Sequence, residues 1–205
     1  IIDDGPVFAQ QVIPLPQQIR EAEGAFKLNK TTAIFPDARF SREASQLSAT
    51  LNLETGLLVP VVRQQTAAHN YILLKTVSSG ILPEGYKVTV SPDLITIEAN
   101  DNAGMFYGCV TLLQLLKIEK PDNRLSGQKS YDITSVQIID WPRFKWRGLM
   151  LDCSRTFISP SYIKKTIDRL AFYKMNILHL HLTDDQGWRL QIKSHPELTA
   201  KGAYF

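Results

Sequence analysis

Two apolar strand patterns flank one helix pattern in the last third of the chain, and together they leave few folds open. The strand patterns cover residues 145–153 and 177–183, and the helix between them begins at Ser159-Pro160 and is expected to end at Asn176. Serine is a preferred cap and proline is favoured at the first helical position. A strand–helix–strand unit of this kind joins two parallel strands by a right-handed crossover. Both strands are apolar on both faces, which indicates that they need cover on both sides.

This unit is too small to form a domain of its own. Residues 141–205 hold a single strand–helix–strand pattern, whereas a (β/α)₈ barrel needs about 250 residues. We therefore expect residues 141–205 to be the first βαβ unit of a truncated barrel that belongs to a larger protein.

Residues 1–140 show a different pattern, in which short strands are mixed with two helices at 41–55 and 102–117. The first helix is expected to be capped by Ser41 and to stop at Gly56, and Asp101 precedes the second. Strands and helices do not alternate regularly, so the pattern predicts an α+β domain whose mainly antiparallel sheet carries the helices on one face. The expected strands are 25–28, 31–35, 57–62, 71–77, 86–90, 94–98 and 133–139.

Composition excludes several classes of protein. The net charge is only +3 and 44% of the residues are hydrophobic, which argues against a disordered chain, a nucleic-acid-binding protein or a membrane-surface protein. No run of about 18 apolar residues is present that could span a bilayer. Cys109 and Cys153 lie in apolar contexts typical of free, buried thiols, although a disulfide between them stays open. Residues 7–11 resemble the remnant of a processed leader, so we expect an exported protein.

Two charged residues follow the two strands at the end where barrel enzymes place their active sites. Arg155 lies just past the first strand and Asp184 just past the second. Because paired strands lie about 4.8 Å apart, we expect the two side chains to be neighbours. They can form a hydrogen-bonding clamp for hydroxyl groups or a structural ion pair, and spacing alone leaves both open. Asp185 either supports the loop or touches substrate, and Asp152 is expected to point away from Arg155 in a structural role.

Other polar residues near these strands favour structural roles. His179 and His181 share one strand face, where a pair can bind a metal, but buried, hydrogen-bonded histidines are the expected interpretation. Trp188 either packs under the site or lines it, and packing is the expected role. Arg147, at the opposite end of its strand, is expected to be structural. Residues 154–160 form no glycine-rich phosphate cradle, which argues against a nucleotide-binding domain.

Three segments resemble family 20 glycoside hydrolases, the β-N-acetylhexosaminidases, in order and spacing. The segment Trp146–Arg155 (WRGLMLDCSR) is similar to the first barrel strand of that family, and Tyr173–Arg189 (YKMNILHLHLTDDQGWR) is similar to its second strand and following loop. The segment Ala103–Leu116 (AGMFYGCVTLLQLL) resembles a helix of the family's non-catalytic α+β domain. The resemblance implies that residues 1–140 are this accessory domain and that residues 141–205 begin the catalytic barrel.

The resemblance also implies an activity and a set of site residues. The family removes terminal β-linked GlcNAc or GalNAc by substrate-assisted retaining hydrolysis, in which the acetamide oxygen of the substrate attacks the anomeric carbon. Arg155 would bind the O3 and O4 hydroxyls of the terminal sugar, and Asp184 and Asp185 would belong to a supporting network. The catalytic Asp-Glu pair, the sugar-stacking tryptophans and the histidine partner of Asp184 are expected beyond residue 205. No metal or organic cofactor is implied.

One departure from the family and one alternative function remain. Many relatives carry histidine where this chain has Thr156-Phe157, which puts one local pocket contact in doubt. The alternative is that this polypeptide is a non-catalytic carbohydrate-associated or interaction module, because it lacks the acid pair. The partners expected for the enzyme are a glycan with a terminal N-acetylhexosamine and the remainder of the catalytic barrel.

Overall fold

The computed structural model describes residues 12–64, 70–118 and 130–204, and the chain divides into two compact units, Ile1–Arg143 and Phe144–Phe205. The expected leader remnant at residues 7–11 and most of the expected connecting loop at 119–131 lie outside the described residues. Among the described residues, no helix is both long enough and apolar enough to cross a bilayer. Cys109 and Cys153 are both free and buried.

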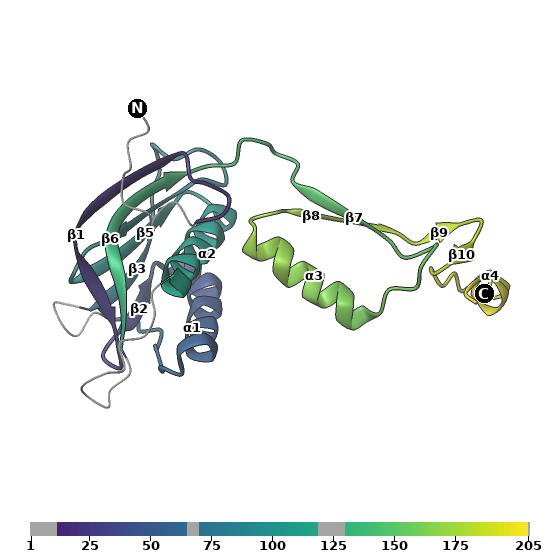
Figure 1. Cartoon of the computed structure of the whole chain (residues 1–205), viewed down its shortest axis with the longest axis horizontal. Helices are drawn as coiled ribbons and strands as arrows, with labels where there is room; N and C mark the ends of the chain where they lie inside the picture. The colour runs from purple at the N-terminus through teal and green to yellow at the C-terminus, as the bar shows by residue number, and fades with distance from the viewer. Residues whose placement is uncertain (1–11, 65–69, 119–129, 205) are drawn as a thin grey trace. The chain divides into compact units, whose positions relative to one another are not determined.

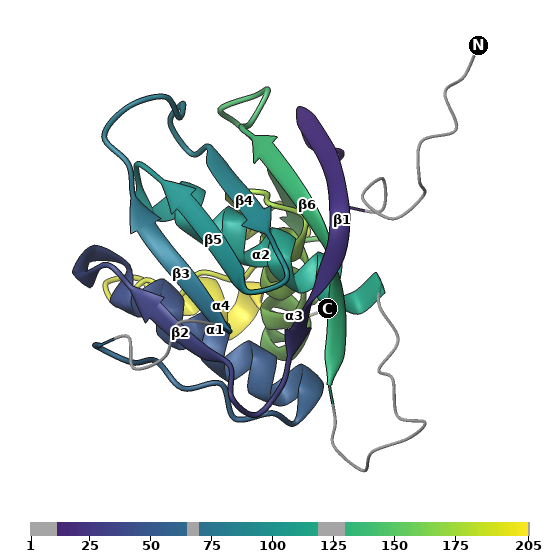
Figure 2. The ribbon, with the colours of Figure 1, turned by 90° about the vertical axis from the view of Figure 1, so that its left-hand side faces the viewer.

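The first unit is built on a six-stranded sheet, seen face-on in Figure 2. In spatial order the strands are β1 (Gln18–Leu28), β6 (Tyr131–Asp140), β4 (Tyr86–Val90), β5 (Leu94–Ala99), β3 (Tyr71–Thr76) and β2 (Ala33–Pro36). The pairings from β1 to β5 are antiparallel, as expected, but β5–β3 and β3–β2 are parallel. Three of the five pairings are antiparallel, so the sheet is mainly antiparallel as predicted, and the β3–β2 side is the parallel part. There, a helical crossover returns the chain from β2 to the start of β3, which makes these two strands parallel.

The predicted strand at residues 57–62 is also wrong. Only a single parallel bridge, between Ile34 and Val61, forms in this segment. The Ile34 N–H donates to the Pro60 carbonyl (2.8 Å), and the Val62 N–H donates to the Ile34 carbonyl (2.8 Å), but Pro60 has no N–H with which to extend the pairing. The segment therefore touches the edge of the sheet without becoming a strand.

Two helices, α1 (Ser41–Thr55) and α2 (Asn102–Ile118), cover one face of this sheet (Figure 1), and the core lies between them and the strands. Asp101 caps α2, because its Oδ1 accepts the Gly104 N–H at 2.7 Å. Gly56 ends α1 in the left-handed conformation, with φ of 71°. The expected Ser41 cap is wrong: a 3₁₀ turn precedes α1, and the Ser41 hydroxyl donates back to the Ala38 carbonyl instead.

A close approach explains why a glycine stands near the start of α2. A Cβ placed on Gly104 would collide with the main-chain carbonyl of Gly85, just before β4. Glycine normally weakens a helix, and here that loss of helix stability is offset by closer packing of the helix against the sheet. The structure identifies the Gly85 main chain as the backbone that approaches α2 here.

The second unit begins with two parallel strands, β7 (Gly148–Asp152) and β8 (Ile177–His181), joined by α3 (Pro160–Phe172) (Figure 1). Ser159 caps α3 as predicted, and its hydroxyl accepts the Tyr162 N–H at 3.3 Å. The helix ends earlier than Asn176, because Lys174 adopts a positive φ of 57°. The chain continues through β9 (Thr183–Asp184), β10 (Gly187–Trp188) and α4 (Glu197–Gly202).

The strand pair of the second unit leaves apolar side chains open to solvent. Leu149, Met150 and Leu180 are 41%, 50% and 36% exposed. Interior parallel strands are normally covered on both faces. These side chains therefore mark a surface on which further structure can pack.

Candidate active site

Arg155 lies in a turn directly after β7, and the last residue of that strand shapes the turn. One carboxylate oxygen of Asp152 accepts the main-chain N–H groups of Ser154 (3.1 Å) and Arg155 (3.0 Å). Its other oxygen accepts a hydrogen bond from Arg155 Nη1 at 2.8 Å. The prediction that Asp152 points away from Arg155 was wrong, because the chain turns after Asp152 and strand alternation no longer applies.

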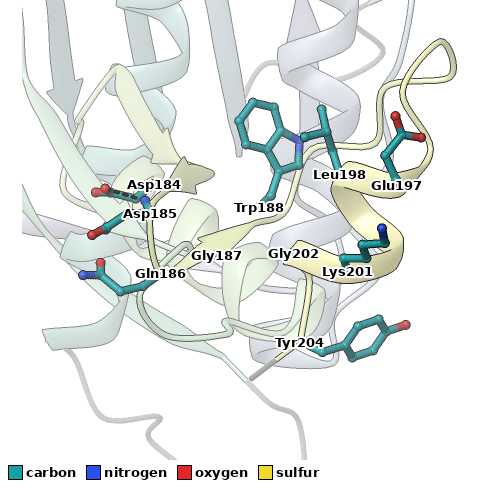
Figure 3. Close-up of a pocket in the computed structure, with 10 residues that line it drawn as sticks. All are labelled: Asp184, Asp185, Gln186, Gly187, Trp188, Glu197, Leu198, Lys201, Gly202 and Tyr204. Carbon is teal, nitrogen blue, oxygen red and sulfur yellow. Dashed lines mark hydrogen bonds between the residues drawn. The ribbon is translucent and has the colours of Figure 1, made fainter.

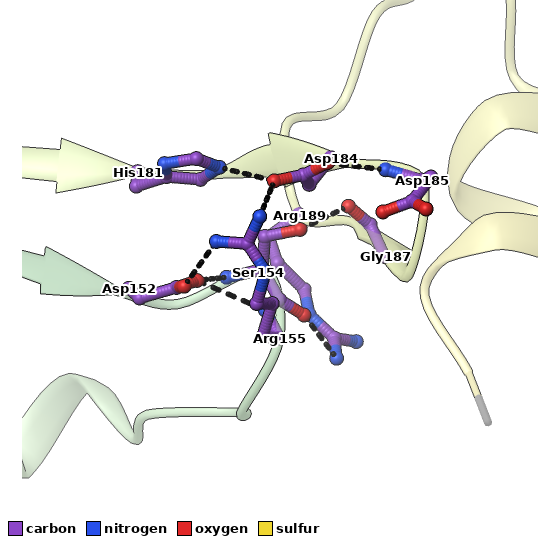
Figure 4. Close-up of polar contacts among 8 residues, drawn as sticks. All are labelled: Asp152, Ser154, Arg155, His181, Asp184, Asp185, Gly187 and Arg189. Carbon is purple, nitrogen blue, oxygen red and sulfur yellow. Dashed lines mark hydrogen bonds and ion pairs between the residues drawn. The ribbon is translucent and has the colours of Figure 1, made fainter.

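Arg155 also reaches the loop after the neighbouring strand (Figure 4). Its Nη2 lies 2.5 Å from Asp184 Oδ2, so the guanidinium bridges the carboxylate at the end of β7 and the carboxylate that follows β8. The expected meeting of Arg155 and Asp184 therefore occurs. The arginine side chain is 52% exposed. A guanidinium carries five N–H donors, and the two carboxylates do not occupy all of them, so donors remain for a ligand.

Asp184 has two further partners. Its Oδ1 accepts the main-chain N–H of Asp185 at 2.8 Å, and its Oδ2 lies 3.1 Å from His181 Nε2. His181 was expected to be a hydrogen-bonded strand histidine, and it is one, although it is only partly buried. His179 is exposed, so its expected burial was wrong. A histidine beyond residue 205 was expected to pair with Asp184; in this structure the pairing histidine is His181.

The charges around the site keep both carboxylates ionised. Hydrogen bonds from the Arg155 main chain and side chain hold the pKa of Asp152 below its ordinary value. The pKa of Asp184 is lowered mainly by the Asp185 N–H, with the Arg155 charge and His181 adding to the effect. In return, the pKa of Arg155 is raised, first by its hydrogen bond to Asp152 and then by the charge of Asp184. Asp152, Asp184 and Arg155 are therefore all charged at neutral pH.

An open pocket of about 520 Å³ lies beside this cluster, between the β9–β10 hairpin and α4 (Figure 3). Asp184, Asp185 and Trp188 line it from the hairpin, and Lys201 and Tyr204 line it from the other side. Asp185 is exposed. Trp188 donates its indole N–H to the Leu190 carbonyl at 2.6 Å. It also lines the pocket, so it both packs at the site and lines it.

Two residues that tie the site together were missed as site residues from the sequence. Ser154 is fully buried, and its hydroxyl donates to the Gly187 carbonyl at 2.6 Å. Arg189 donates to the carbonyls of Cys153 (3.1 Å) and Ser154 (3.3 Å). Their partners are main-chain carbonyls, which leave no signal in the sequence. Arg147, by contrast, was predicted to be structural, and it donates to the carbonyls of Lys174 and Phe144 at the other end of β7.

The arrangement suits binding of a hydroxylated ligand. A planar guanidinium held between two carboxylates offers fixed donors beside fixed acceptors, at the carboxyl ends of two parallel strands. Among the described residues, no three His, Cys, Asp or Glu side chains come together in a way that could hold a metal ion. The fold and the site together define a charged, partly exposed edge at the carboxyl ends of two parallel strands, suited to binding a hydroxylated ligand.

The comparisons with known proteins agree on one family. Residues 144–205 match the catalytic domain of glycosyl hydrolase family 20, and residues 9–141 match domain 2 of the same family. A beta-hexosaminidase of Porphyromonas gingivalis is 34% identical over 195 residues, and a beta-N-acetylhexosaminidase of Cellulomonas fimi is 34% identical over 198 residues. Each alignment covers 94% of this chain. The chain therefore belongs to glycosyl hydrolase family 20.

Solved structures give the same result for the fold. A family 20 exo-beta-N-acetylglucosaminidase of Vibrio harveyi, in complex with N-acetylglucosamine, matches 95% of this chain with a TM-score of 0.82 and 34% identity. A Streptomyces plicatus N-acetyl-beta-hexosaminidase matches 98% with a TM-score of 0.80 and 34% identity. The chain spans 25% and 38% of the Porphyromonas and Cellulomonas relatives, and 29% and 42% of these two structures.

Proposed function

We propose that this chain is part of an exo-β-N-acetylhexosaminidase that removes terminal β-linked GlcNAc or GalNAc from glycans. Residues 1–140 are its accessory α+β domain, and residues 141–205 are the first βαβ unit of a (β/α)₈ catalytic barrel. The family membership and the parallel β7–β8 pair support this assignment. The exposed apolar residues of β7 and β8 are then the surface on which the remainder of the barrel packs.

The observation that carries the proposal is the Arg155 bridge between Asp152 and Asp184. In the proposed enzyme, the free donors of Arg155 bind the O3 and O4 hydroxyls of the terminal sugar. Asp184 keeps the guanidinium in place, and Asp185 fixes the Asp184 carboxylate through its main-chain N–H. Because Asp152 and Asp184 hold two sides of the guanidinium, the hydroxyls meet a group whose orientation is already fixed, which lowers the entropy cost of binding.

The chemical step is substrate-assisted and retaining. The acetamide oxygen of the substrate attacks the anomeric carbon, a glutamic acid protonates the leaving group, and the aspartate before it orients the acetamide. The sequence contains no Asp-Glu dipeptide, so this pair comes from a later strand of the whole enzyme. The role of this chain in the reaction is to hold and orient the terminal sugar.

The test compares two proteins on an aryl N-acetyl-β-D-glucosaminide: the complete protein that contains this chain, and the 205-residue chain alone. The complete protein should hydrolyse the substrate, and the chain alone should show no turnover above background. Loss of the general acid alone costs roughly 10²–10⁴-fold, and the acetamide-orienting aspartate is missing as well. Turnover by the 205-residue chain, or none by the complete protein, would contradict the proposal.

We also propose that the protein is exported, as the composition of residues 7–11 suggests. Cell fractionation of the native host, followed by the same glycoside assay on each fraction, tests this. Activity confined to the cytosolic fraction would overturn it.

A further inference from the structure

Arg189, which follows β10, reaches across to the turn that carries Arg155 (Figure 4). Its Nε donates to the Cys153 carbonyl at 3.1 Å, and its Nη2 donates to the Ser154 carbonyl at 3.3 Å. Its Nη1 donates to the Ala203 carbonyl after α4. The two carbonyls in the turn belong to the residues that lie between Asp152 and Arg155, so Arg189 holds the main chain on which Arg155 is mounted.

A second contact ties the same two loops in the opposite direction. The buried hydroxyl of Ser154 donates to the Gly187 carbonyl in β10 at 2.6 Å. In addition, the Phe157 ring lies 5.8 Å from the Arg189 guanidinium carbon, within the range of a cation–π contact. The turn with Arg155 and the hairpin with Asp184 are therefore joined by hydrogen bonds from both sides. Phe157 takes part in this connection by packing on Arg189.

We propose that Arg189 is a positioning residue that acts through Arg155. Arg155 is half exposed and its side chain is long, so its direction depends on the main chain of the turn as well as on its two carboxylates. The planar fork of Arg189 fixes two successive carbonyls of that turn, which a lysine ammonium cannot do with the same geometry. This keeps the guanidinium of Arg155 aligned with Asp184 and with the sugar hydroxyls. The inference rests on the proposed sugar-binding role of Arg155.

The chain offers a matched control in Arg147. It also donates to two main-chain carbonyls, those of Lys174 and Phe144, both at 2.8 Å, but at the opposite end of β7 from the site. Arg147→Lys should therefore weaken the same unit without disturbing Arg155. Any effect specific to Arg189→Lys then reports on the site and not on the general stability of the unit.

The activity test is a double-mutant cycle in the complete enzyme, measured as kcat/KM on an aryl N-acetylglucosaminide. Arg189→Lys should lower kcat/KM by about 10-fold in the wild-type background, mainly through KM. In the Arg155→Ala background the same substitution should cost less than about twofold, because the group it positions is absent. Arg147→Lys should change kcat/KM by less than about twofold in either background. Equal losses for Arg189→Lys in both backgrounds would overturn the inference.

A second measurement needs no catalysis and therefore separates this inference from the proposed function. In the ¹⁵N-labelled complete protein, the side-chain Nε–H of Arg155 should exchange with water several-fold faster in Arg189→Lys than in wild type or Arg147→Lys. An exchange rate unchanged by Arg189→Lys would overturn the inference, even if the enzyme is active. An inactive complete protein with the expected exchange pattern would overturn only the proposed function and leave the link between Arg189 and Arg155 standing.

Discussion

Replacing Arg155 is the sharpest test of how the site holds its ligand. In the structure one nitrogen of the guanidinium bonds Asp152 at 2.8 Å and the other lies 2.5 Å from Asp184, which leaves N–H donors for sugar hydroxyls. A charge-assisted hydrogen bond contributes roughly 10- to 150-fold to binding. Arg155→Ala removes the pair of hydrogen bonds to the sugar hydroxyls, together worth roughly 2–4 kcal/mol because neighbouring contacts do not simply add, so kcat/KM of the complete enzyme should fall by about 30- to 1,000-fold.

The same reasoning predicts which substitutions and which substrates should show the larger loss of kcat/KM. Arg155→Lys should recover little of the loss, because a single ammonium cannot bridge both carboxylates and also bind two hydroxyls. With aryl glycosides that lack the O3 or the O4 hydroxyl, wild type and Arg155→Ala should differ less than with the parent substrate. The matched control is Arg169→Ala on the exposed surface of α3, which should leave kcat/KM unchanged.

The assay is initial-rate kinetics with release of the aryl group, on variants whose melting temperatures have been checked by circular dichroism. A kcat/KM for Arg155→Ala within about threefold of wild type would refute the reasoning. So would an equal loss on the deoxy substrates, because Arg155 would then affect the enzyme without touching the hydroxyls.

Three further predictions test the neighbouring contacts and the packing of the first unit. Asp184→Asn should lower kcat more than it raises KM, measured with the same substrate; a fall in melting temperature with kcat retained would show a purely structural pair. The carboxyl carbons of Asp152 and Asp184 should titrate below the ordinary aspartate value of about 3.9 in ¹³C NMR. Their lowered pKa values stabilise the fold above that pH, and this contribution is lost as pH falls through the folded-state values, so midpoints at or above 3.9 would contradict the contacts. Gly104→Ala should destabilise the chain by about 3 kcal/mol in urea unfolding, because the added methyl meets the Gly85 carbonyl, whereas a glycine without this contact would gain about 0.5–1 kcal/mol.

Local signals in the sequence were sufficient for much of the fold. The Ser159-Pro160 start of α3, the Gly56 end of α1 and the strands β4 and β5 were all predicted, because each depends on residues within a few positions of one another. The parallel pairings on the β3–β2 side were missed. Which strand lies beside which depends on contacts far apart in sequence, and a crossover through α1 leaves no mark on the strands themselves.

In the candidate site, too, some contacts could be predicted from the sequence and others could not. Arg155 and Asp184 could be placed together because each follows a strand of one βαβ unit, and the carboxyl ends of parallel strands meet. The role of Asp152 could not, because strand alternation predicts the wrong side once the chain turns. Arg189 could not either, since its partners are the carbonyls of Cys153 and Ser154 and any residue would supply them.

Two sets of contacts therefore determine the direction of the Arg155 side chain, one on its guanidinium and one on the turn that carries it, and they are not equally predictable from the sequence. Asp152 and Asp184 fix the guanidinium through charge, and only the contact with Asp184 was predictable from residue types and spacing. The turn beneath it is fixed by Asp152 accepting two main-chain N–H groups, by the Ser154 hydroxyl and by Arg189. Asp152 belongs to both sets of contacts, because one of its oxygens accepts main-chain N–H groups of the turn and the other accepts a hydrogen bond from the Arg155 guanidinium. Removing the Asp152 carboxylate should therefore disturb Arg155 more than removing the Asp184 carboxylate, although the strand pattern predicted Asp184, and not Asp152, as the neighbour of Arg155.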